Sequence, residues 1–181
     1  MTIPPLSPLG HLPQGRYQTD LVEVEQRFVH NLDPIRSDLW NELRQAMTWV
    51  RGAVPLCAIW LAGSFTSNKP QPEDIDVLFW VDSREAAKVP QGSQNSQLLS
   101  VFSNQQAKTV LNLRLDTYLV AWVSDPASTH STEVLDYFTN RGYWDDWWQR
   151  LRSGPKSAAP TPSDSLPRRG YLEVIIDGFQ P

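Results

Sequence analysis

Two aspartates stand two positions apart in an otherwise apolar stretch, which reads DIDVLFWV from Asp74. Side chains alternate between the two faces of a strand, so Asp74 and Asp76 are expected to project from the same face. Two neighbouring carboxylates repel each other unless a basic group or a cation lies close to both. Carboxylate oxygens suit Mg²⁺, which keeps water and substrate phosphates in its other coordination positions. The pair therefore predicts a magnesium site.

A Gly-Ser turn precedes this pair along the chain. Gly63 and Ser64 end the apolar run LCAIWLA, and a short turn-rich loop leads from them to Asp74. Glycine permits a sharp turn with positive φ, and the free N–H groups of such a turn bind phosphate oxygens. Lys69 lies in the loop, where it either touches a triphosphate or remains a solvated surface lysine.

A third acid, Asp116, lies in the run LRLDTYLVAWV, where an unpaired carboxylate is costly. If this run forms a strand beside residues 74–81, Asp116 joins the first two acids. Three carboxylates can hold two Mg²⁺ ions, as nucleotidyl transfer requires. The alternative partners for Asp116 are Arg114 and a backbone N–H group, and Arg114 could instead contact a phosphate.

The order of Gly63-Ser64, Asp74-Ile75-Asp76 and Asp116 resembles the core of the DNA polymerase β-type nucleotidyltransferase superfamily, over roughly residues 55–123. The whole chain also resembles uncharacterised bacterial and phage proteins with the same elements. The resemblance implies a nucleotidyltransferase with two Mg²⁺ ions and a nucleoside triphosphate as substrate. The three aspartates would bind metal, and Gly63, Ser64 and Lys69 would contact the nucleotide.

The same resemblance implies transfer of a nucleoside monophosphate to a hydroxyl of a protein or an RNA such as tRNA. Small bacterial members of the superfamily often belong to toxin–antitoxin or phage-defence modules. The alternative function is a catalytically silent, antitoxin-like module that binds a protein. The Trp-rich helix at 143–151 would supply its interface, although Trp144, Trp147, Trp148 and Leu151 also fit an apolar stripe that packs on the sheet.

The elements that must position these residues follow from the apolar pattern. It predicts helices at 20–30, 35–51, 84–90, 97–110 and 131–151, the last broken near Gly142, and strands at 56–62, 74–81, 113–123 and 170–179. This order indicates an α/β (α+β) fold with a single mixed sheet flanked by helices. Residues 1–152 are expected to form a nucleotidyltransferase-like domain with an extended arm at 1–18. A Pro/Ser-rich linker at 153–167 then leads to a segment at 168–181, whose strand is expected at the sheet edge.

Composition limits the remaining classes of function. The net charge of −4 argues against a protein that holds long nucleic acid over its whole surface, and it favours a protein acceptor over tRNA. It leaves room for a small basic site that binds one nucleotide. No apolar run reaches the roughly 18 residues needed to span a bilayer, and no secretory signal is recognisable. With its single cysteine, Cys57, the chain is expected to be cytoplasmic.

Overall fold

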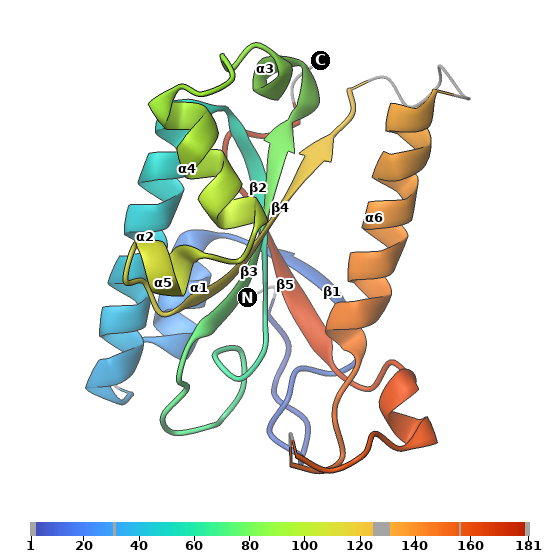
Figure 1. Cartoon of the computed structure of the whole chain (residues 1–181). Helices are drawn as coiled ribbons and strands as arrows, with labels where there is room; N and C mark the ends of the chain where they lie inside the picture. The colour runs from blue at the N-terminus through green and yellow to red at the C-terminus, as the bar shows by residue number, and fades with distance from the viewer. Residues whose placement is uncertain (1–2, 31, 125–130, 156, 180–181) are drawn as a thin grey trace.

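The computed structural model describes residues 3–30, 32–124, 131–155 and 157–179. One five-stranded mixed sheet lies between helices on its two faces (Figure 1), which confirms the expected α/β class. The strands are β1 (Gly15–Thr19), β2 (Leu56–Ala62), β3 (Ile75–Asp82), β4 (Leu115–Trp122) and β5 (Gly170–Ile175). The helices are α1 (Leu21–Phe28), α2 (Pro34–Ala53), α3 (Ser83–Ala87), α4 (Gln94–Ser103), α5 (Ala107–Val110), α6 (Thr132–Gln149) and the 3-10 helix η1 (Pro162–Ser165).

The strand order of the sheet is β1-β5-β2-β3-β4. Strand β2 is antiparallel to both of its neighbours, whereas the β3–β4 and β1–β5 pairs are parallel. The expectation that the C-terminal strand lies at an edge is wrong, because β5 lies between β1 and β2. The edge beside it is β1, which belongs to the segment expected to be an extended arm. Positions in β1 alternate between half-buried and exposed, so this strand lacks the apolar run that marks a buried one.

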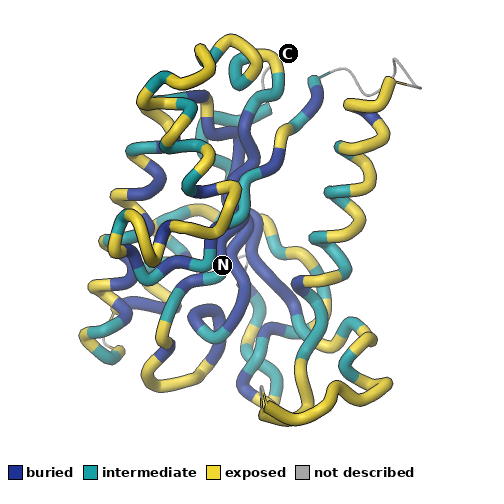
Figure 2. Tube along the Cα trace, in the orientation of Figure 1, coloured by how far each residue is buried: buried dark blue, intermediate teal, exposed yellow. Residues whose placement is uncertain are grey.

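The sheet separates two apolar layers. Ile75, Val77 and Phe79 of β3 belong to the layer that α2 and α4 cover. Leu78 and Trp80 belong to the layer beneath α6, on the opposite face. Figure 2 shows the central strands buried and the outer faces of the helices exposed. Because side chains alternate along β3, the residues in phase with Leu78 and Trp80 must face α6.

Two helix boundaries differ from the sequence-based prediction. The expected helix at 97–110 is two helices, because Gln105 adopts a left-handed φ of 58° between α4 and α5. The expected break near Gly142 is absent, and α6 runs without interruption from Thr132 to Gln149. A glycine weakens a helix by only about 1 kcal/mol, which the packing of α6 on the sheet can offset. Asp20 caps α1, accepting a hydrogen bond from the Glu23 N–H.

The expected linker at 153–167 contains regular structure. It contains η1, and it returns to the end of α6, where the N–H groups of Arg168 and Arg169 donate to the Gln149 carbonyl at 2.7 and 3.0 Å. Residues 1–2 of the expected arm, residue 156 of the linker and residues 180–181 of the C-terminal segment lie outside the described part. Within that part, none of the helices combines the length and apolarity that crossing a bilayer requires.

Candidate functional site

The parallel pairing of β3 with β4 places two of the predicted acids side by side. Asp76 of β3 lies in register with Asp116 of β4, and on its other side with Ala62 of β2. Both aspartates are in phase with the strand residues that face α6. Asp74 directly precedes β3, where the Ile75 N–H already donates to the Arg114 carbonyl at 3.1 Å. The three carboxylates therefore come from one end of two adjacent strands.

A lysine that the sequence did not single out lies between two of these acids. The Lys108 ammonium of α5 is 2.6 Å from Asp74 Oδ2 and 2.7 Å from Asp116 Oδ1. Burial alone would lower the pKa of Lys108, but its hydrogen bonds to Asp116 and Asp74 raise that pKa overall. Across the described residues, no three His, Cys, Asp or Glu side chains are close enough to form a metal cluster. The cation that offsets the repulsion between Asp74 and Asp116 is thus an ammonium group of the chain itself.

Asp76 is half-buried, and its ionisation is perturbed. Its pKa is raised from 3.8 to about 6, first by burial and then by the neighbouring charge of Asp74. Arg169, just before β5, is the first of the nearby cations that oppose this shift, followed by Lys108. A substantial share of Asp76 side chains therefore carries a proton near pH 6. A carboxyl group with such a pKa can accept or release a proton close to neutral pH.

The Gly-Ser turn packs directly against Asp76. Gly63 has a φ of +75°, and a Cβ atom built on it would lie 1.7 Å from Asp76 Oδ2. Glycine is therefore required both for the backbone conformation and for the close approach of the carboxylate. Residues 63–66 form a turn and not the first turn of a helix. The turn is held by side chains of its own loop, because Thr66 Oγ1 donates to the Gly63 carbonyl and Ser67 Oγ to the Ser64 carbonyl.

Arg36 of α2 holds the same loop from inside the protein. Its side chain is only 2% exposed. Four backbone carbonyls accept hydrogen bonds from its guanidinium group, namely those of Phe28, Phe65, Ser67 and Lys69. A buried guanidinium group is tolerated only when its N–H groups have hydrogen-bond acceptors. These four carbonyls supply the acceptors. Arg36 therefore fixes the path of the loop that leads from Gly63 to Asp74.

Two other candidates have partners away from the three acids. Lys69 forms an ion pair with Glu73 at 3.8 Å and lines a cavity of about 470 Å³ together with Arg36. Its contact with a triphosphate stays a prediction. Arg114 donates to the Glu42 carboxylate through Nε at 2.8 Å and Nη2 at 2.5 Å. The alternative that pairs Arg114 with Asp116 is therefore wrong for this arrangement, and a contact of Arg114 with a phosphate stays a prediction.

The Trp-rich end of α6 has two sides. Trp144 packs on Tyr118 of β4, with ring centroids 4.3 Å apart, and Trp148 is buried against Tyr171 of β5. Trp147 points away from the sheet and is 47% exposed. The expected stripe against the sheet is thus correct for Trp144 and Trp148 and wrong for Trp147.

The comparisons with known proteins identify a family and no activity. The family described as "Family of unknown function (DUF6932)" matches residues 4–175, so the chain belongs to that family. No curated protein and no solved structure matches the chain.

Proposed function

We propose that this DUF6932 member is a Mg²⁺-dependent nucleotidyltransferase with a nucleotidyltransferase-like sheet. The observation that carries the proposal is the register of the β3–β4 pair, which aligns Asp76 with Asp116 two residues after Asp74. Acids at the ends of adjacent strands, beside a tight Gly-Ser turn, are the arrangement expected for binding a metal-bound triphosphate. The substrate would be a nucleoside triphosphate, and the acceptor a hydroxyl of a protein or of an RNA such as tRNA.

The donor set suits a hard cation. Asp74 Oδ2 and Asp116 Oδ1 already converge on one positive charge, the Lys108 ammonium group, at 2.6 and 2.7 Å. Mg²⁺ binds carboxylate oxygens at about 2.0–2.1 Å, so a small inward movement and withdrawal of Lys108 would allow it to bind. Lys108 is 41% exposed and can swing into solvent. Bound Mg²⁺ would act as a Lewis acid that offsets the negative charge of the phosphate oxygens.

The protein groups have separate roles in this proposal. The Gly63–Ser64 turn would donate N–H groups to the terminal phosphates. The acceptor hydroxyl oxygen would form a bond to the α-phosphorus, while the bond from that phosphorus to the bridging oxygen of the β-phosphate breaks and pyrophosphate leaves. Asp116 would help to activate the hydroxyl by accepting its proton. Asp74 and Asp76 would bind the Mg²⁺ to which the phosphates attach, and so position the reacting phosphate in line with the acceptor.

A second candidate function has its own observation. Lys108 forms ion pairs with both Asp74 and Asp116. Such pairing is expected of a protein in which these aspartates stabilise the fold. In that case the chain would be a catalytically silent, antitoxin-like module. The exposed aromatic side chains of α6, Phe138, Tyr143 and Trp147, would form its protein-binding surface.

Calorimetric titration of the whole chain with MgCl₂ and each nucleoside triphosphate separates the two candidates. We expect Mg²⁺ to tighten the binding of a triphosphate to the wild type, and Asp74→Asn/Asp116→Asn to lose this Mg²⁺-dependent gain. Asp136→Asn removes an exposed carboxylate from α6 and is the matched control. Transfer of label from an α-³²P triphosphate to protein or RNA would then identify the acceptor. Absence of Mg²⁺-dependent binding, or equal binding by the double variant, would reject the enzyme and favour the silent module.

A further inference from the structure

A large cavity lies at the end of α6. It has a volume of about 1030 Å³ and is lined by residues from the end of α6, from η1 and from the segment just before β5. Its lining includes Trp147, Arg150, Arg152, Thr161, Pro162 and Arg169. Small-ligand sites are typically cavities of about 300–1,000 Å³, so this one is large enough for a mononucleotide. None of the catalytic roles proposed above uses it.

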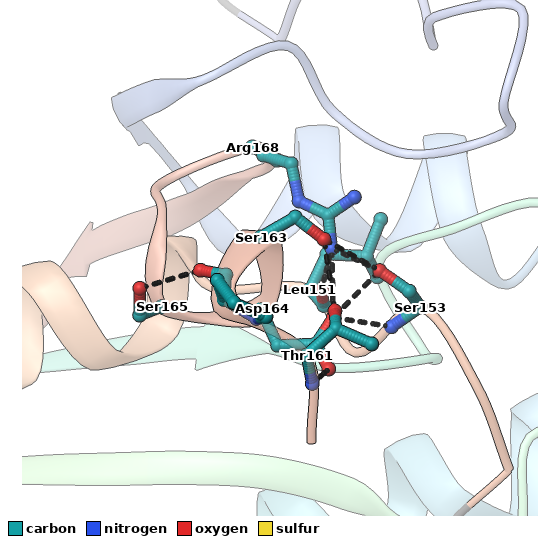
Figure 3. Close-up of polar contacts among 8 residues, drawn as sticks. Leu151, Ser153, Thr161, Ser163, Asp164, Ser165 and Arg168 are labelled. Carbon is teal, nitrogen blue, oxygen red and sulfur yellow. Dashed lines mark hydrogen bonds and ion pairs between the residues drawn. The ribbon is translucent and has the colours of Figure 1, made fainter. Parts of the chain in front are cut away.

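The wall of the cavity is held in place by one carboxylate. Figure 3 shows Asp164 of η1 surrounded by donors from the segment that follows α6. Asp164 Oδ1 accepts from Ser153 N at 2.7 Å and Ser153 Oγ at 2.6 Å, and Oδ2 accepts from Thr161 N at 2.8 Å. These hydrogen bonds, from Ser153 first and then from Thr161, lower the pKa of Asp164. The wall is therefore formed before any ligand arrives, which reduces the entropy cost of binding.

The charges in and around this cavity are unevenly paired. Arg150 forms an ion pair with Asp146, and Arg168 forms one with Asp164. In the described part of the chain, Arg152 and Arg169 hydrogen-bond only to backbone carbonyls, those of Ala158 and Trp148 respectively. Two guanidinium groups in the cavity therefore lack a directly bonded carboxylate. Guanidinium groups present a planar set of donors that fits a phosphate group.

An aromatic ring completes the lining. Trp147 is nearly half exposed, and the guanidinium carbon of Arg150 lies 5.7 Å from the centroid of its ring. Tyr143 stacks nearly parallel to the same indole, at a centroid distance of 6.0 Å, and keeps it in place. An exposed, supported indole beside arginines is the usual platform for stacking a nucleic-acid base.

We propose that this cavity binds a nucleotide, with the base on Trp147 and a phosphate on Arg152 and Arg169. Arg169 connects the cavity to the proposed site, because its charge also acts on Asp76. The binding itself stands apart from catalysis, whereas the part that the nucleotide plays in the reaction rests on the proposed function. The nucleotide would be either the donor triphosphate or the terminal nucleotide of an RNA acceptor.

The test is binding of ligands to the whole chain in EDTA, which removes any metal from the proposed site at Asp74, Asp76 and Asp116. The probes are AMP, ATP, a pentaribonucleotide, adenosine as the phosphate-free control and an acidic peptide as the alternative class of ligand. We expect AMP to bind more tightly than adenosine. Trp147→Leu should weaken AMP binding roughly 5- to 150-fold, the range for loss of one base–aromatic stack. Arg152→Gln should also weaken it and reduce its salt dependence. Phe138→Leu changes another exposed aromatic side chain of α6 and should have no effect.

Each outcome bears directly on the proposal. Tighter binding of ATP than of the pentaribonucleotide assigns the cavity to the donor, and the reverse order assigns it to an RNA acceptor. The proposal is overturned if no nucleotide binds at millimolar concentration, if Trp147→Leu and Arg152→Gln bind as the wild type does, or if the acidic peptide alone binds. Asp74→Asn/Asp116→Asn should keep this EDTA-resistant binding, so a failure of the proposed catalysis is recognised separately.

Discussion

Replacing Asp76 with asparagine should make the protein more stable at neutral pH. The pKa of Asp76 is about 6 in the folded chain, against an ordinary value of 3.8, because burial and the charge of Asp74 disfavour the ionised form. A shift of about two units corresponds to roughly 3 kcal/mol between the two protonation states. The folded state binds more protons than the unfolded state between the two pKa values. The free energy of unfolding therefore falls as the pH rises through this window. Asparagine has nearly the same shape as aspartate and removes this cost.

The assay is urea denaturation of the wild type and Asp76→Asn in EDTA, from pH 4 to pH 8. When the unfolding free energies of the two proteins are subtracted, the contributions of all titratable groups that they share cancel. We expect this difference to be smallest near pH 4 and to grow toward about 3 kcal/mol in favour of the variant above pH 7. Asp136→Asn, on the exposed face of α6, should show no such growth.

Two results would refute this reasoning. One is a difference that stays constant within about 0.5 kcal/mol across the whole pH range, which would mean that the folded environment leaves Asp76 unperturbed. The other is a variant that becomes relatively less stable as the pH rises. That result would mean that Arg169 and Lys108 outweigh burial and hold the carboxylate in its ionised form.

Three further substitutions test the supports of the site. Gly63→Ala should destabilise the fold by at least about 1–3 kcal/mol in urea denaturation, because it adds a Cβ where only glycine fits; Gly52→Ala, in open space on a helix, should be neutral or slightly stabilising. Arg36→Met should cost about 3 kcal/mol or more, since four carbonyls lose their donor, whereas Arg44→Gln on the exposed side of α2 should change stability by less than about 0.5 kcal/mol. Lys108→Gln should tighten Mg²⁺ binding about 2- to 5-fold in calorimetry, because a competing cation is removed, and unchanged or weaker binding would contradict the proposed competition.

The strands of the site could be predicted because their sequences are unambiguous. LCAIWLA is a continuous apolar run, and all its residues are buried in β2. The spacing of Asp74, Asp76 and Asp116 also led to the correct strands. The strand order could not be predicted in the same way. The hydrophobic pattern indicates where a strand lies in the sequence but not which other strands it pairs with. Strand β1, GRYQT, was missed because a half-exposed edge strand needs no apolar run.

The missed functional residues differ in the signal that they carry. Arg36 is in helical phase with Trp40, Leu43 and Met47, all buried, so a charge inside an apolar stripe was visible in the sequence. For Lys108, the neighbouring sequence gives no comparable indication of a role. Its partners come from other segments of the chain, and only the pairing of β3 with β4 brings them together.

The internal position of β5 has a consequence for how the chain is made. On the ribosome, β2 and β3 are synthesised long before β5, yet β2 needs β5 along one of its two edges. Until residues 170–175 emerge, the nascent chain exposes an apolar strand edge that can pair with other chains. Completion of the sheet therefore waits for the last of its five strands. Contacts this distant along the chain also make folding slow, so newly made protein is exposed to aggregation and to chaperones before it can work.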